Sequence, residues 1–520
     1  MKTLNYILGI IAVSATITSC VGDLKVTPID PNANTADKAL VDQTSFQNFL
    51  AGVYLGFATS GYYGANGSAS ISGLDGGASQ YIRGLYHHSE LTTDESVCGW
   101  NDQTIKNFHY MNWTTDDSFI YAFYSRIFMQ VGMANEFIRE AKASEVDFDT
   151  KQQLIDEARV LRAIAYYHAI DNFGNVPFAD ETAIVGQNPE QISRADLYKW
   201  LENELTDLVN SSALPAKGAT TSRASKGAAK FLLAKLYLNA KVYAGTEAYD
   251  KCADVLKDLM DDGYSLHTTS AGTYSAYQEL FLADNNLCTD EIIFAVEQDG
   301  VNTTSYGATN YIIFASTGGE MDPDAAGISS GWGGLRMTPE FYNKFSDGDA
   351  RKLFYTATQK ADIDDIGEFT NGYAFQKFLN RTSTGGYGKE KGFVDTDFPM
   401  MRYADVLLMA AECEFRGKPV DGYAGYKAVR ARAGLAQTAP ASIDDILDER
   451  ARELYQECWR RNDLIRCERF VSGYTWQWKG NVKEGKDVDK GRELFPIPDS
   501  DLLANTKLQQ NEYYKTSTAE

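Results

Sequence analysis

The chain is poor in the residues that build small metal and redox sites. It has seven cysteines and five histidines among 520 residues, and no Cys-x-x-Cys occurs. This excludes a disulfide-stapled scaffold, a zinc ribbon and a thioredoxin-like motif. His-Glu-x-x-His, Gly-x-Ser-x-Gly, P-loop and dinucleotide-binding glycine patterns are also missing. We therefore expect no metal, no cofactor and no enzymatic activity, and we interpret the cysteines in the body as small core residues.

Positive charge is also scarce. The chain has 49 Lys and Arg against 71 Asp and Glu, a formal net charge of −22. Such a surface repels phosphate backbones, so we expect no nucleic acid partner. Aromatic residues are plentiful at 12% of the chain, with 31 tyrosines among them, and hydrophobic residues make up 44%. This composition excludes a mostly disordered protein.

The first twenty residues are typical of an export signal. Lys2 precedes an apolar stretch over 4–17 that is too short for a mature membrane-spanning helix, and Ile17-Thr18-Ser19-Cys20 follows. Such a cysteine resembles the acylated residue of a bacterial lipobox, so we expect a lipoprotein signal peptide over 1–19 and a lipidated tether over 20–34. The alternative is an ordinary secretory peptide with an incidental cysteine. No later stretch offers 18 uncharged apolar residues.

The body shows helical periodicity. Apolar residues recur at spacings of three and four in four stripes: Leu154, Ala158, Leu161, Ala165 and His168; Ala229, Leu233, Leu236 and Ala240; Ala404, Leu408, Ala411 and Phe415; Ile443, Leu447, Ala451, Leu454 and Cys458. Further helices are expected over 118–143, 194–210, 247–261 and 423–433. The alanine-rich stripes favour closely packed helix pairs, so the sequence predicts an irregular, all-α-dominated solenoid with a few short strands, one of them over 291–296.

Two glycine-rich stretches interrupt this pattern. Nine glycines lie between Gly52 and Gly84 and eight between Gly300 and Gly334, with aromatic and small polar residues among them. We interpret both stretches as loops. Long loops on an ordered scaffold often carry function. We expect one domain over 35–520, with a helical scaffold at about 118–265 and 400–470 and a loop-rich binding region at about 52–117 and 265–400.

Six segments, in this order, resemble the SusD/RagB family of surface glycan-binding lipoproteins of Bacteroidetes. They read EARVLRAIAYY (157–167) with FGNVP (173–177); SKGAAK (225–230) with LAKLYL (233–238); PMMRYADVLL (399–408); VRARAGL (429–435); ERAREL (449–454) with WRRNDLIR (459–466); and LFPIP (494–498) with Asn511 and Tyr513. The resemblance implies a tetratricopeptide-like helical fold, attachment to the outer membrane with the protein facing the cell surface, a glycan ligand from polysaccharide utilisation, and a SusC-like TonB-dependent transporter over which the protein acts as a lid.

Sugar rings have apolar faces and hydroxyl edges, so a glycan site needs converging aromatic side chains and a few polar partners. The loops supply the candidate platforms Trp100, Trp332, Tyr306, Tyr311 and Tyr81. The candidate hydroxyl partners are Asp75, Arg83, Asn101 and Gln103. Each could instead serve only to pack or solvate its loop.

Two alternative functions stay open at this point. An envelope adhesin would use the same solenoid for protein contacts, and a secreted glycosidase would need two carboxylates that no motif marks here. The charged run Arg450, Arg452, Glu453, Arg460, Arg461, Asp463 and Arg466 is interpreted as structural ion pairing.

Overall fold

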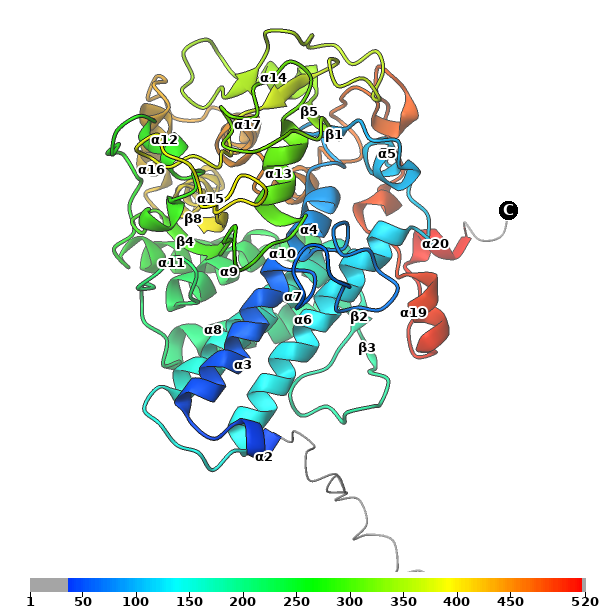
Figure 1. Ribbon diagram of the computed structural model, residues 1–520, viewed down its shortest axis with the longest axis vertical. Coiled ribbons are helices and arrows are strands. Elements are labelled where there is room, and N and C mark those ends of the chain that lie inside the picture. Colours follow the sequence, from blue (N-terminus) through cyan, green and yellow to red (C-terminus); the bar gives the residue numbers. More distant parts are fainter. Residues whose placement is uncertain (1–35, 517–520) are drawn as a thin grey trace, which may run out of the picture.

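The computed structural model describes residues 36–516, and its scaffold is a succession of packed helices. The long helices are α3 (Gln43–Ala58), α6 (Ser118–Ala143), α7 (Lys151–Asn172), α8 (Arg194–Ser211), α9 (Lys226–Leu238), α11 (Tyr249–Met260), α15 (Tyr403–Phe415), α16 (Gly422–Arg432) and α17 (Ile443–Leu454). From α3 to α16, each long helix packs on the next one along the chain, and α17 packs on α15. Figure 1 shows α3, α6 and α7 running side by side, with the strands β1 and β5 and the helices α13 and α14 gathered at the opposite end of the molecule.

The remaining helices are short and lie mostly in the connections. They are α2 (Ala36–Ala39), α4 (Tyr81–Ser89), α5 (Gln103–Tyr110), α10 (Ala240–Ala244), α12 (Ala276–Glu279), α13 (Ala308–Ser316), α14 (Pro339–Tyr342), α18 (Arg460–Arg466), α19 (Asp499–Ala504), α20 (Glu512–Thr516) and the 3₁₀ turns η1 (Asn285–Leu287), η2 (Lys479–Asn481) and η3 (Lys490–Glu493). The predicted helix-dominated fold is confirmed. The predicted stripe ending at Cys458 is too long, because α17 ends at Leu454.

Strands are few, and all their pairings within the described residues are antiparallel. One sheet has the order β1 (Val97–Cys98), β5 (Leu335–Met337), β7 (Tyr373–Phe375), β6 (Phe354–Tyr355). A second joins β2 (Val176–Pro177) to β3 (Gln191–Ile192), and a third joins β4 (Ile292–Val296) to β8 (Phe398–Arg402). The strand predicted over 291–296 is therefore present as β4. Its partner β8 runs directly into α15, which fastens the loop-rich part of the chain to the scaffold.

Two helices lie where the glycine-rich loop was predicted. Helix α3 begins with a capping box, in which Asp42 accepts a hydrogen bond from the backbone N–H of Ser45 at 2.8 Å. Gly56 serves close packing, because a Cβ there would lie 2.1 Å from a side-chain oxygen of Gln130 in α6, whereas the space around Gly52 is open. The same holds in α4, where a Cβ at Gly84 would meet the ring of Phe123 at 2.8 Å. The loop interpretation of 52–84 is thus correct only for the stretch between α3 and α4.

The charged run near residue 460 is structural, as predicted. Arg450 is buried and donates to Asp463 and Asp405 at 2.7 and 2.6 Å, and Arg460 pairs with Asp94 at 2.7 Å. These carboxylates come from separate elements, so the arginines join distant parts of the chain. Removing one partner of a buried pair leaves an uncompensated charge and costs about 3–5 kcal/mol.

Candidate functional site

Three of the predicted aromatic residues come together at the loop-rich end. Trp100 follows β1, Trp332 precedes β5 and Tyr306 precedes α13. The ring centroids of Trp100 and Trp332 are 6.2 Å apart with an angle of 50° between the rings. Those of Trp332 and Tyr306 are 6.1 Å apart at 58°. All three side chains are partly exposed, so together they form a continuous tilted row of rings.

Phe393 extends this row, and the sequence analysis missed it. Its ring lies 5.5 Å from that of Tyr306 at 46°, and it is also partly exposed. We call Trp100, Trp332, Tyr306 and Phe393 the aromatic arc. Phe393 lies 61 positions beyond Trp332 in a charged loop without another tryptophan or tyrosine beside it, so no local pattern marked it; only the fold brings it to Tyr306.

The loops that carry the two tryptophans are fixed by backbone hydrogen bonds. The β1–β5 pairing sets Cys98 opposite Leu335. Trp100 donates its indole N–H to the carbonyl oxygen of Trp332 at 3.3 Å. A side chain at Gly334 would displace Trp100, because a Cβ there would lie 2.8 Å from the Trp100 ring. Gly333 has a φ of +58°, in the left-handed region that favours glycine. Gly334 therefore serves the contact between the two loops, and Gly333 serves the turn of the backbone beside Trp332.

Arg83 supports the arc from α4. Its guanidinium carbon lies 5.4 Å from the ring centroid of Trp100 and 4.6 Å from that of Tyr311, and its Nη1 donates to the carbonyl oxygen of Tyr306 at 3.3 Å. Such cation–π contacts are stronger when the cation is desolvated. Burial lowers the pKa of Arg83. The structure thus brings Arg83 into the predicted site, and its pairing with a sugar hydroxyl stays a prediction.

The predicted ligand contacts of Tyr311 and Tyr81 are wrong, since both rings are fully buried. Tyr311 lies beneath the arc and meets Trp100 edge to face at 5.8 Å. Tyr81 hydrogen-bonds through its hydroxyl to Nδ1 of His168 at 2.8 Å in the core. Tyr81 is the first residue of α4, and Tyr311 lies within α13. Neither helix was predicted from the sequence, so the burial of these side chains was not expected. Their role is to pack the scaffold beneath the site.

The other three predicted polar partners are exposed beside the arc and have local hydrogen bonds. Asp75 accepts from the backbone N–H groups of Gly77 and Ala78 at 2.9 and 2.7 Å, and so holds the loop against Tyr306. Asn101 and Gln103 flank the start of α5. Asn101 accepts from the ammonium group of Lys106 at 2.7 Å, and Gln103 donates to Asn107 at 2.8 Å. Their contact with a ligand stays a prediction.

The loop between α3 and α4 adds a second pair of aromatic side chains. Tyr62 and Tyr63 are 74% and 84% exposed. Three residues further on, Asn66 accepts a hydrogen bond from the hydroxyl of Tyr306 at 2.8 Å. The loop therefore contacts the arc directly. Two adjacent tyrosines within a glycine- and serine-rich stretch were the signal that could have identified them.

The part of the chain that the structure describes offers neither a metal site nor a membrane span. Over residues 36–516, no three or more His, Cys, Asp and Glu side chains are grouped to hold a metal ion. Within the same residues, no helix has the length and apolar character needed to cross a membrane. The predicted lipidation site Cys20 lies outside the described residues, as do the signal peptide over 1–19 and the tether over 20–34.

Comparisons with known proteins agree with this architecture. A family model described as "SusD family" matches residues 350–514, and one described as "Starch-binding associating with outer membrane" matches residues 75–238. The chain is 29% identical to the starch-binding protein SusD of Bacteroides thetaiotaomicron, over 97% of this chain and 98% of that protein. It is 24% identical to the SusD-like protein P2 of Formosa agariphila, over 76% and 81% of the two chains.

Solved structures show the same fold. Surface glycan-binding protein A from Bacteroides fluxus superposes with a TM-score of 0.71 at 20% identity, over 91% of this chain and 100% of that one. The protein of that name from Bacteroides thetaiotaomicron, in complex with laminarihexaose, gives 0.70 at 17% identity over the same shares. The helical scaffold with its loop-rich end therefore has the SusD-like fold. In sequence and in fold the chain is similar to the SusD/RagB family.

Proposed function

We propose that this protein binds an oligosaccharide on the aromatic arc, at the outer surface of the cell, and does not hydrolyse it. The observation that carries the proposal is the row of partly exposed rings, each within 6.2 Å of the next. Apolar ring faces of sugars stack on such side chains, and several rings are needed because one alone contributes only about 2 kcal/mol when partly covered.

The tilt of the rings indicates the shape of the ligand. Neighbouring rings of the arc make angles of 50°, 58° and 46°. A flat, ribbon-like chain could stack on only one of them, whereas a glucan that turns along its length could meet each in succession. The relatives support this choice, because one is named as starch-binding and one was solved with laminarihexaose. We therefore propose a curved glucan as the ligand class.

The resemblance to the SusD/RagB family supports a role in passing the bound ligand to a transporter. We propose that acyl chains on Cys20 anchor the protein to the outer membrane and that it passes its ligand to a SusC-like TonB-dependent transporter, as a lid over it. More than one acyl chain gives a stable anchor, at ~0.8 kcal/mol per buried CH₂. Asp75, the one acid among the predicted site residues, accepts hydrogen bonds from the backbone of its own loop, which supports binding without hydrolysis.

Affinity electrophoresis tests the proposal with starch, laminarin and hydroxyethyl cellulose in the gel, alongside an assay for released reducing sugar. We expect retardation by starch or laminarin, little by the cellulose derivative, and no release. Release of reducing sugar would instead identify a glycosidase. Migration unchanged by every polysaccharide would favour the adhesin function.

The exposed tyrosines of the loop are expected to add to this contact. Replacing both, as Tyr62→Ala with Tyr63→Ala, should weaken glucan binding several-fold while thermal stability stays unchanged, because neither side chain is buried. Isothermal titration with maltoheptaose and laminarihexaose measures the effect. Equal affinity in the double variant would exclude these residues from the site.

A further inference from the structure

A pair of partly exposed aromatic side chains lies outside the arc, at α5. Tyr110 is the last residue of α5 and Trp478 directly precedes η2. Their ring centroids are 6.2 Å apart with an angle of 47° between the rings. Trp100 and Trp332 in the arc have nearly the same geometry, 6.2 Å and 50°. We call Tyr110 and Trp478 the α5 platform, and Figure 1 shows α5 next to β1 at the loop-rich end.

The α5 platform and the arc share one support. Both rings of the platform pack on a small buried cluster of Val97, Ile363 and Ile366. Val97 lies in β1, three residues before Trp100. A Cβ at Gly99 would lie 2.8 Å from the carbonyl oxygen of Ile366, so the loop that carries Trp100 is in close contact with this cluster. The distance between the two aromatic surfaces is therefore fixed by packed residues.

The segment that holds this cluster is fastened to β5. Arg336 is fully buried and donates to the carbonyl oxygens of Ile366 and Asn371 at 2.5 and 2.9 Å. Phe369, between them, is partly exposed and lies against the arc, because a Cβ at Gly333 would be 3.6 Å from its ring. Partly exposed rings thus continue from the arc onto the segment that supports the platform.

The backbone of Trp478 has a conformation that large side chains rarely adopt. Its φ is +68°, in the left-handed region that favours glycine. Its backbone N–H donates to the carbonyl oxygen of Lys483 at 3.1 Å, and its indole N–H donates to that of Ile363 at 2.8 Å. Residues held in such conformations cluster at ligand-binding positions. Because the N–H is engaged, the part of this side chain that remains for a ligand is the ring.

Exposed charged groups lie beside the rings. Lys483 pairs with Asp362 at 3.0 Å and also with Asp364, and both acids are exposed. Burial, and then the charge of Asp365, raises the pKa of Tyr110, which places a third exposed carboxylate near the phenol hydroxyl. Aromatic faces edged with hydrogen-bonding groups are what sugar rings and their hydroxyls need.

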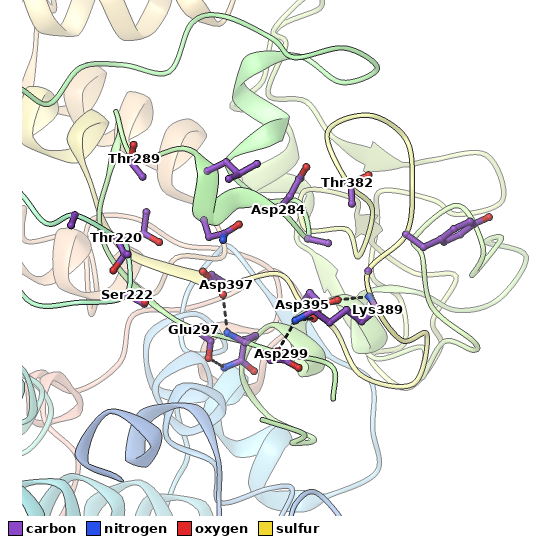
Figure 2. A pocket seen from close by; sticks show the side chains of 18 residues that line it. Thr220, Ser222, Asp284, Thr289, Glu297, Asp299, Thr382, Lys389, Asp395 and Asp397 are labelled. Carbon is purple, nitrogen blue, oxygen red and sulfur yellow. Dashed lines mark hydrogen bonds and ion pairs between the residues drawn. The ribbon is translucent and has the colours of Figure 1, made fainter. Parts of the chain in front are cut away.

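The cleft beside β4 and β8, drawn in Figure 2, offers no such surface. It has a volume of about 770 Å³, and Tyr387 is the one aromatic residue that lines it. The guanidinium carbon of Arg381 and the ammonium nitrogen of Lys391 each lie 4.0 Å from the centroid of that ring. A ring already in contact with two cations is poorly available for stacking, so the α5 platform is the better candidate for a further sugar contact.

We propose, on the basis of the proposed glucan binding, that the α5 platform is a second contact site for the same glucan, used by chains long enough to extend beyond the arc. Once a chain is bound at the arc, its contact with the platform is intramolecular, so two sites on one rigid support bind a long chain more tightly than either does alone. A short oligosaccharide occupies the arc only. The protein therefore prefers polysaccharide over short oligosaccharide.

Two binding assays separate long ligands from short ones. Affinity electrophoresis in starch and in laminarin measures polysaccharide affinity, and isothermal titration with maltotriose and laminaritriose measures trisaccharide affinity. Trp478→Ala should weaken polysaccharide binding about tenfold, a change of ~1.4 kcal/mol, and leave trisaccharide binding unchanged. Trp478→Leu keeps apolar packing on the buried cluster but lacks the ring, so it should have nearly the same effect with less risk to folding.

Two further variants are the controls. Trp200→Ala removes a partly exposed tryptophan of α8, whose ring centroid lies 5.1 Å from that of Phe178. This is a similar ring pair on the helical scaffold, so the variant should bind both kinds of ligand as wild type does. Trp332→Ala, in the arc, should weaken the binding of both.

The outcomes distinguish the platform from the arc. Unchanged polysaccharide affinity in both Trp478 variants, with weakening in Trp332→Ala, would overturn the platform and leave the arc in place. The reverse result would support the platform and refute the arc. Equal weakening of trisaccharide and polysaccharide binding by Trp478→Leu would also overturn the platform, because Trp478 would then act by supporting the arc. Wild type that neither polysaccharide retards would overturn both sites.

Discussion

Replacing Trp332 by alanine is the sharpest test of the arc. The ring lies between Trp100 and Tyr306, at 6.2 and 6.1 Å. Covering roughly 50 Å² of it and a similar area of sugar, at ~25 cal/mol per Å², stabilises the complex by about 2.5 kcal/mol. Some of this offsets the ordering of the ligand. We expect Trp332→Ala to weaken glucan binding by about 2 kcal/mol, which is about 30-fold.

The assay is isothermal titration with an oligosaccharide that wild type binds, together with thermal unfolding. Trp332 also packs on Phe314, with ring centroids 4.9 Å apart, so a stability loss of about 1–2 kcal/mol is expected. Trp459→Ala is the matched control. That ring is 6% exposed and lies under the ammonium group of Lys235 at 3.8 Å, so its loss should cost about 3–5 kcal/mol of stability and leave glucan affinity unchanged. Unchanged affinity in Trp332→Ala would refute the arc as the site.

Two further predictions concern the support of the arc. Burial raises the pKa of Glu90 to about 8, and burial together with the charge of Glu90 raises the pKa of Glu95. Between pH 4.5 and 8 the folded protein therefore binds more protons than the unfolded chain, so the free energy of unfolding falls as pH rises. Glu90→Gln should flatten this slope by up to ~1.4 kcal/mol per pH unit in urea unfolding at several pH values, and an unchanged slope would contradict the assignment. Gly334→Ala should push Trp100 aside and weaken glucan binding about tenfold at a stability cost of ~1–3 kcal/mol, measured by titration and melting. Gly132→Ala, with open space around its Cβ, is the control, and equal binding by both variants would show that the contact is dispensable.

Helices were predictable where apolar spacing was regular. The helix expected over 118–143 has those bounds in the structure as α6, and the stripe that starts at Ile443 begins α17, with Ser442 as its N-cap. Helix α3 was missed although Phe46, Leu50, Val53 and Phe57 form a clear stripe, because its glycines favour a loop interpretation. Glycine in a helix also permits close approach of a neighbouring helix, and only the packing partner distinguishes the two cases.

The aromatic residues of the site were predictable only where their sequence neighbours marked them as loop residues. Trp100, Trp332 and Tyr306 stood out because polar and glycine-rich neighbours left them outside any apolar stripe. Tyr311 lies in the same kind of sequence but belongs to α13, whose residues are all buried. Phe393 had no distinguishing neighbours at all. The exposure of an aromatic residue depends on what packs over it. Contacts between distant parts of the chain cannot be predicted from the spacing of neighbouring residues.

The arc is supported by a buried connection between segments that are far apart in the chain. Residues 90–96, which lead from α4 to β1, are buried. The side chain of Asp94 accepts from Arg460 at 2.7 Å, its carbonyl oxygen accepts from the hydroxyl of Thr338, and Glu95 accepts from the backbone N–H of Gln456. The segment that leads to Trp100 is thus hydrogen-bonded to Thr338, Gln456 and Arg460 without any ligand. Rings held in place in this way lose little freedom on binding, so more of the contact energy appears as affinity. We therefore expect the buried ion pairs to contribute to ligand binding although they lie away from the arc.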